Sequence, residues 1–97
     1  MYFVVSKWEC IPGHEEEFLE KGLAMRKLLK RQPEVKLFES FRNGMGEVVI
    51  VMAYESEDAY KAVIQDPNGA FARAMVEHKV EEHSRWLWSE RGEEEFR

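Results

Sequence analysis

The sequence has little cysteine and no long apolar segment. Its single cysteine, Cys10, excludes an intrachain disulfide, and with it a secreted scaffold held together by disulfides. No apolar run approaches the ~20 residues that a membrane-spanning helix needs. The N-terminal residues also lack the basic start and apolar stretch of a signal peptide. We therefore expect a cytoplasmic protein that does not enter a membrane.

Positive charge is scarce and scattered. The chain has 14 basic and 19 acidic residues, for a net charge of -5, and the two signs alternate along it. A nucleic-acid-binding surface needs basic residues clustered on one face, so we expect no nucleic-acid partner. The densest basic group, Lys27, Lys30 and Arg31, falls where a helix is expected to end, and a helix dipole favours cations there.

The remaining composition is typical of one globular domain. Hydrophobic residues make up 44% of the 97 residues and aromatic residues 12%, which is enough for a packed core. We expect residues 1–97 to form a single domain.

Hydrophobic periodicity predicts four strands and two helical regions. Apolar side chains alternate in the strands and recur every three to four residues in the helices. The predicted strands are residues 2–11, 34–42, 47–54 and 85–89. The predicted helices are residues 14–32 and a second region from 57 that is interrupted at 66–69. The charged tail, residues 91–97, is predicted to fray.

Local signals refine this pattern. The stretch 43–46, Asn-Gly-Met-Gly, predicts a hairpin turn between the second and third strands. Ser56 is placed to cap the second helix. Gly22 costs about 1 kcal/mol relative to alanine inside a helix, so we expect it to mark a close approach of the first helix to the sheet.

The order of these elements predicts an α+β fold. Strand, helix, strand, strand, helix, strand gives a ferredoxin-like βαββαβ antiparallel sheet with both helices on one face. The strand at 47–54 is apolar on both faces, so the face without helices would expose a large apolar surface. We therefore expect a symmetric homodimer through the open sheet face.

Three segments resemble the antibiotic biosynthesis monooxygenase superfamily of dimeric α+β barrels. They are PGHEEEF at the first helix, Pro33 at its end, and VVIVMAYESEDAYKAVIQDP from the third strand into the second helix. The resemblance implies two sheets that face each other across a dimer, and a pocket between sheet and helices in each subunit. Some members of that family oxidise polycyclic phenols with molecular oxygen and no cofactor, so no cofactor is implied here.

The resemblance also assigns roles to individual residues. Tyr54 stands where the cofactor-free oxygenases carry an aromatic residue at the end of the third strand, and Tyr60 matches a tyrosine one turn into the helix. Arg73 matches an arginine after the helix break. The family's asparagine in the third strand falls on Ile50, which cannot donate a hydrogen bond. These matches imply that Tyr54 and Ile50 contact the substrate, and that Tyr60 and Arg73 are catalytic.

Other candidates come from residue type and spacing. His78 is a candidate proton acceptor, because histidine titrates near neutral pH. His78 and His83 are five residues apart, so one helix face cannot present both to a metal, and we expect no metal site. Trp86 and Trp88 would share one face of the last strand beside Trp8, either as an aromatic wall for a flat ligand or within the dimer interface.

Three functional hypotheses follow. The first is a cofactor-independent monooxygenase that acts on a small phenolic or enolic aromatic molecule between the sheet and the helices. The second is a non-catalytic, dimeric protein that binds a small ligand or has a stress-related role. Isoleucine at position 50 favours this second hypothesis. The third is an isomerase or lyase of a related dimeric barrel, with His78 and its neighbouring carboxylates as the acid–base pair.

Overall fold

The computed structural model describes residues 1–96, and four strands build its single antiparallel sheet. In the order in which they lie side by side, the strands are β2 (Val35–Arg42), β3 (Val48–Tyr54), β1 (Tyr2–Cys10) and β4 (Ser84–Glu93). Strands β1 and β3 are therefore the two central strands of the sheet, and β2 and β4 are its edges. This order confirms the predicted ferredoxin-like arrangement.

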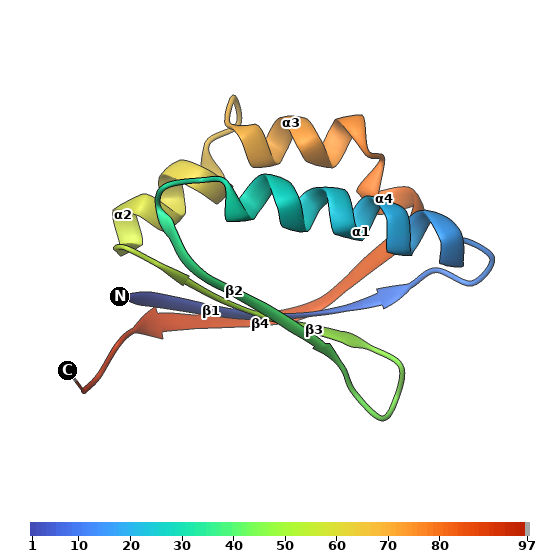
Figure 1. The fold of residues 1–97 in the computed structure, drawn as a ribbon, viewed down its shortest axis with the longest axis horizontal. Coiled ribbons are helices and arrows are strands. Elements are labelled where there is room, and N and C mark those ends of the chain that lie inside the picture. Colours follow the sequence, from blue (N-terminus) through green and yellow to red (C-terminus); the bar gives the residue numbers. More distant parts are fainter. Residues whose placement is uncertain (97) are drawn as a thin grey trace.

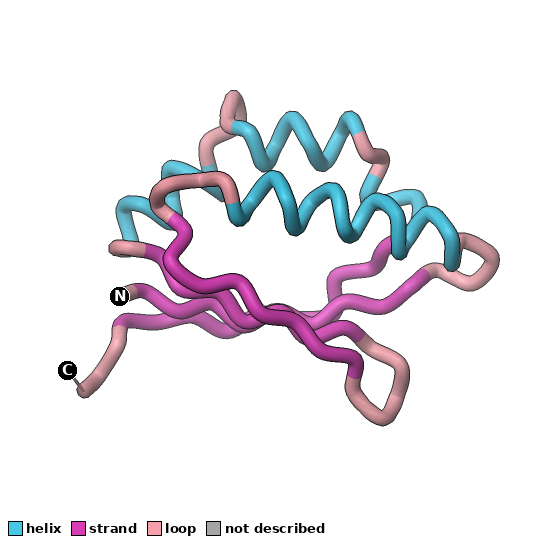
Figure 2. Tube along the Cα trace, in the orientation of Figure 1, coloured by secondary structure: helices cyan, strands magenta, loops and turns pink. Residues whose placement is uncertain are grey.

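All helices lie on one side of this sheet (Figures 1 and 2). They are α1 (Glu15–Lys30), α2 (Glu57–Tyr60), a π-helical turn η1 (Lys61–Gln65), α3 (Ala70–Glu77) and α4 (Val80–His83). Within residues 1–96 no helix combines the length and the apolar character needed to cross a membrane. The opposite face of the sheet carries no helix (Figure 2).

Two predicted local signals are confirmed by hydrogen bonds. In the β2–β3 hairpin, Asn43 Oδ1 accepts from the backbone N–H groups of Met45 and Glu47, each at 2.9 Å. Gly46 in the same turn has a φ of +79°, which favours glycine. At the start of α2, Ser56 Oγ accepts from the N–H of Ala59 at 3.0 Å and caps the helix.

The C-terminal third differs from its prediction in two ways. Lys79 adopts a left-handed conformation, with φ and ψ both at 48°, and divides the last helical region into α3 and α4. Strand β4 extends to Glu93 rather than ending at residue 89, and Gly92 and Glu93 pair with Phe3 and Tyr2. An edge strand pairs through its backbone, so polar side chains did not prevent the tail from joining the sheet.

The buried core lies toward one end of the sheet. It is formed by residues that are at most 8% exposed: Tyr2, Leu29, Phe38, Met52, Tyr54, Tyr60 and Val63. Leu29 comes from the last turn of α1, and it is the buried residue of that helix. Near the start of the helix, Leu19 and Leu23 are each 58% exposed. Helix α1 therefore packs tightly near its C-terminus and leaves the sheet uncovered near its N-terminus.

Gly22 corrects one sequence prediction. A Cβ atom at this position would meet no atom within 4 Å beyond its own chain neighbours and helix backbone, so the helix does not approach the sheet closely there. The absence of a side chain at Gly22 leaves empty space beside α1 and does not serve a close contact between the helix and the sheet.

We expect Gly22→Ala to raise the free energy of unfolding by about 1 kcal/mol, because alanine favours a helix and nothing blocks its methyl group. Gly46→Ala is the matched control, and it should destabilise because its φ is positive. Chemical denaturation of both variants measures the difference. A loss of stability in Gly22→Ala would contradict the open packing of α1.

Candidate functional site

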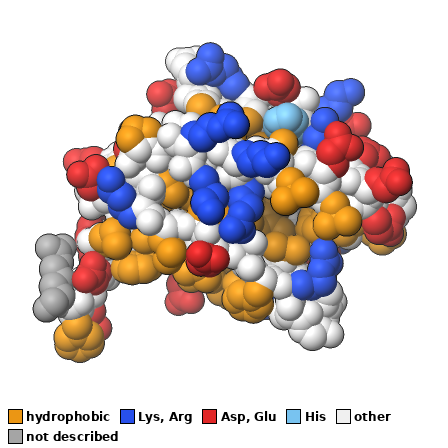
Figure 3. Space-filling view, in the orientation of Figure 1, with side chains coloured by type: hydrophobic (Ala, Val, Ile, Leu, Met, Phe, Trp, Pro, Cys, Tyr) orange, Lys and Arg blue, Asp and Glu red, His pale blue; other side chains and the backbone are white. Residues whose placement is uncertain are grey.

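A cavity of about 680 Å³ lies between the helices and the sheet. Figure 3 shows its position as a recess below α1, with hydrophobic side chains at the bottom and Lys or Arg side chains on either side. The volume lies within the range of roughly 300–1,000 Å³ typical of small-molecule sites. The recess follows from the uneven packing of α1.

The floor of the cavity consists of side chains that the strand register arranges in rows across the sheet. One row, from β2 to β4, is Arg42, Val48, Trp8 and Trp86. The next row is Ser40, Ile50, Ser6 and Ser89. Neighbouring strands are ~4.8 Å apart, so each row offers a strip that a flat molecule can cover.

The roof is almost entirely apolar. It is made by α1 and by the helices that follow β3, with the lining residues Phe18, Leu19, Gly22, Leu23, Met25, Ile64, Phe71 and Met75. Aliphatic and aromatic walls with a few polar groups are typical of sites for small organic ligands. The exposure of Leu19 and Leu23 is explained by this opening.

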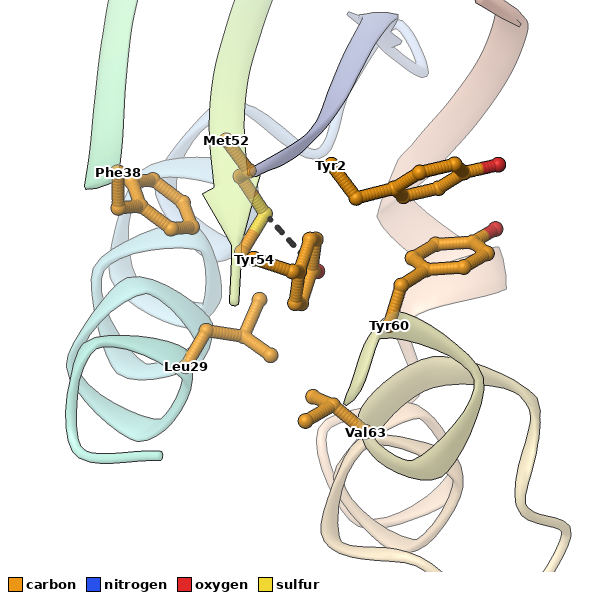
Figure 4. Packing of buried hydrophobic residues seen from close by; sticks show 7 residues of the cluster. All are labelled: Tyr2, Leu29, Phe38, Met52, Tyr54, Tyr60 and Val63. Atoms are coloured by element: carbon orange, nitrogen blue, oxygen red, sulfur yellow. Dashed lines mark hydrogen bonds between the residues drawn. The ribbon is translucent and has the colours of Figure 1, made fainter. Parts of the chain in front are cut away.

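Tyr54 and Tyr60 close the end of the cavity next to the core. Their rings lie 5.3 Å apart at 74°, an edge-to-face contact. The Tyr54 hydroxyl donates to Met52 Sδ at 3.4 Å, and the hydroxyl of Tyr60 points away from Phe38 and Met52 (Figure 4). Burial, helped by the neighbouring Tyr60, raises the pKa of Tyr54 far above its ordinary value. Tyr54 therefore stays protonated and does not act as a base.

His83 is a second deeply buried ionisable group of the cavity lining, with 2% exposure. Its Nε2 lies 3.1 Å from the carbonyl oxygen of His78, and because a carbonyl only accepts, Nε2 carries the proton. In the neutral ring Nδ1 then accepts from the hydroxyl of Ser84, 2.8 Å away. Ser84 also lines the cavity. The site thus places a serine hydroxyl within hydrogen-bond distance of an imidazole nitrogen.

Five of the predicted site residues line this one cavity: Trp8, Ile50, Tyr54, Tyr60 and Trp86. Arg73 on α3 is exposed, and His78 at its end is half-buried. The described cavity lining includes neither of these two side chains. Their predicted catalytic roles therefore stay predictions.

The predicted common face of Trp86 and Trp88 is wrong. The pairing of β1 with β4 shifts between Lys7 and Trp8, so Trp88 pairs with Lys7 and Trp86 pairs with Trp8. Trp86 consequently lies in the cavity, whereas Trp88 lies on the other face with Lys7 Nζ 5.6 Å above its ring. An extra residue in one strand reverses the facing of every residue beyond it.

Sequence reasoning missed the polar residues of the cavity, among them Arg26, Arg42, His83 and Ser84. Arg42 is two residues from Ser40, and Ser84 is two residues from Trp86, so each faces the cavity like its neighbour on the strand. This alternation is a signal that could have identified both residues. His83 precedes its strand and gave no such signal. Among residues 1–96, no group of three His, Cys, Asp or Glu side chains is placed to hold a metal ion.

The comparisons with known proteins agree with this architecture. The family described as antibiotic biosynthesis monooxygenase matches residues 1–68, and the chain belongs to this family. No curated protein matches the sequence.

Two solved structures illustrate the similarity of fold. SnoaB from Streptomyces nogalater, described as a cofactor-independent oxygenase, matches with a TM-score of 0.75 and 14% identity over 99% of this chain and 94% of its own. Rv0793 from Mycobacterium tuberculosis matches with a TM-score of 0.78 and 13% identity over 99% of this chain and 96% of its own.

The raised pKa of Tyr54 predicts a pH effect on stability. In the unfolded chain this phenol ionises near pH ~10, while the folded protein keeps the proton. The free energy of unfolding should therefore fall above pH ~10, by at most about 1.4 kcal/mol per pH unit from this group. Tyr54→Phe should show a shallower decline than the wild type when denaturant unfolding is measured from neutral to alkaline pH. Parallel curves for the two proteins would contradict the assignment.

Proposed function

We propose that the protein is a cofactor-independent oxygenase that acts on a small phenolic or enolic aromatic substrate in the cavity between α1 and the sheet. The observation that carries this proposal is the combination of aromatic walls and a buried His83–Ser84 pair in one cavity. The family membership of residues 1–68 and the fold shared with a cofactor-independent oxygenase support it.

Binding of the substrate uses the indoles and the apolar roof. Trp8 and Trp86 are adjacent in one row of the floor, and a flat aromatic ring buries much surface against them. Trp8 is held in place because its Nε1–H donates to Ser6 Oγ at 3.0 Å. Tyr54 and Tyr60 then limit how far the ring can slide toward the core.

Removal of a proton starts the reaction. Ser84 Oγ accepts the proton of the substrate as it passes its own to His83 Nδ1, while Nε2–H stays bonded to the carbonyl of His78. The low exposure of His83 keeps bulk water from competing for this proton. The product of this step is a substrate carbanion, stabilised as a phenolate or enolate.

The oxygen chemistry then needs no further group. The carbanion gives its electron pair to dioxygen, forming a C–O bond and a peroxide that takes back the proton from His83. Loss of the second C–H proton breaks the O–O bond, leaves a carbonyl and releases water. The balanced reaction is R₂CH₂ + O₂ → R₂CO + H₂O, in which carbon is oxidised and dioxygen is reduced.

Oxygen uptake by metal-free protein tests the proposal, with anthrone-type phenols and hydroquinones as substrates. We expect turnover without added cofactor, and His83→Gln should lower kcat/KM by about 100-fold or more, since general bases contribute at least this much. His14→Gln is the matched control, because His14 is at the exposed start of α1 and bonds to Glu17.

Two further arms keep this test decisive. His78→Gln asks whether the predicted acceptor outside the cavity lining is the base; a loss confined to this variant would overturn the role of His83. Circular dichroism verifies that each variant is folded. No uptake with any substrate would overturn the oxygenase proposal.

A second candidate is a dimeric protein that binds a small ligand without reacting with it. Ile50 favours it, because this side chain lies in the floor of the cavity where the family resemblance places an asparagine amide. Saturable quenching of tryptophan fluorescence by the same aromatic compounds, without oxygen uptake, would support this candidate.

We also propose that the open face of the sheet forms a homodimer. Val5 and Val51 pair at its centre, and Glu90 and Glu39 flank them on the two edge strands. An apolar centre with a charged rim is typical of protein interfaces. Ile50 and Met52 face the helices, so Val49 and Val51 of β3 would contact the partner.

Val51→Asp should therefore convert the dimer to a monomer, because it would place a charge in an apolar interface core. Val76→Asp makes the same change at a residue that is 78% exposed on α3, and it should leave the dimer intact. Size-exclusion chromatography with light scattering measures both masses. A stable dimer from Val51→Asp would contradict the proposed interface.

A further inference from the structure

The ionisable side chains that line the cavity carry only one sign of charge. These charged side chains are Arg26 and Arg42, and no Asp or Glu of the described chain lines the cavity. This is unexpected in a protein with 19 acidic and 14 basic residues. The cavity is therefore a local site of positive charge in an acidic molecule.

Arg26 is held across the opening between α1 and β2. Its Nη1 donates to Ser40 Oγ at 2.9 Å, and its guanidinium carbon lies 5.1 Å from the centre of the Phe38 ring. Both contacts leave the positive charge without a counter-ion. A guanidinium has five N–H donors, and the structure gives one of them a bond, so several remain for a ligand.

Arg42 extends this charge along the same strand. Ser40 and Arg42 lie on one face of β2, ~7 Å apart along the strand, and both line the cavity. Arg42 Nη1 donates to the carbonyl oxygen of Gly46 at 3.0 Å. Within residues 1–96 no carboxylate forms an ion pair with either arginine. Two guanidiniums without an ion-pair partner in the lining of one apolar cavity form a site for an organic anion.

We propose that the ligand of this cavity is an aromatic acid, whose carboxylate binds Arg26 and Arg42 and whose rings cover Trp8. This inference rests on the proposed function, because it names the substrate class of the same cavity. The strand register gives an approximate scale for the ligand. Arg42, Val48 and Trp8 stand in one row, and two strand spacings separate Arg42 from Trp8 by ~10 Å. A bicyclic or tricyclic aromatic carboxylate spans this distance.

A pair of compounds that differ only in charge tests the inference. Anthraquinone-2-carboxylate and anthraquinone-2-carboxamide have the same ring system, and both are already oxidised, so calorimetry measures their binding without turnover. We expect the wild type to bind the carboxylate about tenfold more tightly than the amide, as charge-assisted hydrogen bonds give. This ratio should fall as the salt concentration rises.

Variants assign the effect to the two arginines. Arg26→Gln and Arg42→Gln should each lower the carboxylate-to-amide ratio by about fivefold or more, while affinity for the amide stays within about twofold and so shows that the cavity is intact. Arg31→Gln is the control, because Arg31 is an exposed residue outside the lining. Arg73→Gln asks whether the arginine predicted from the family resemblance selects the anion instead.

The outcomes separate this inference from the proposed function. Equal affinity for the two compounds in the wild type, or loss of the preference only in Arg73→Gln, overturns the aromatic-acid inference alone. Failure of both compounds to bind overturns it together with the role of the cavity as a binding site. Absence of oxygen uptake overturns the oxygenase proposal and leaves the result of the binding experiment unchanged.

Discussion

Packing of Tyr54 against Tyr60 holds the helical layer to one end of the sheet. Tyr54 ends β3 and Tyr60 ends α2, and their rings meet 5.3 Å apart across a short connection. Leu29 joins the same core from the last turn of α1. Toward the start of α1 the packing against the sheet is looser, and Leu19 is exposed. The cavity lies under this loosely packed part of α1, next to the core.

Much of the fold could be predicted from the sequence because the signals are local. Strand alternation, the cap at Ser56 and the turn around Asn43 each depend on a few neighbouring residues. Gly22 shows where such reasoning fails: whether a glycine marks contact or space depends on the distance between layers, which the tyrosine packing at the far end determines. The prediction of which sheet face Trp88 occupies failed for a related reason. The extra residue of β4 opposite Lys7 and Trp8 changes the pairing of the strands, but it leaves no mark in the pattern of apolar and polar residues.

The candidate site divides in the same way. Ile50 and Tyr54, both predicted to contact a substrate, line one cavity because residues four apart on a strand share a face. Arg73 lies on α3 and His78 directly follows that helix, which ends at the left-handed turn of Lys79, and no sequence signal indicated that turn. His83 comes after the same turn. Its burial depends on the backbone around it, where its own carbonyl accepts from Ile11 N–H, a contact between segments far apart in the sequence.

The difference in exposure between His83, at the end of α4, and Trp86 on β4 bears on how an open cavity could protect reactive intermediates. Trp86 at the opening is 55% exposed, whereas His83, three residues earlier, is 2% exposed. Proton transfer to His83 needs a site without bulk water, and no helix covers the opening. An aromatic acid held at Arg26 and Arg42 would lay its own rings over Trp8 and Trp86, between the solvent and His83. The substrate itself would then close the cavity, so recognition of its carboxylate and exclusion of water would depend on the same two arginines.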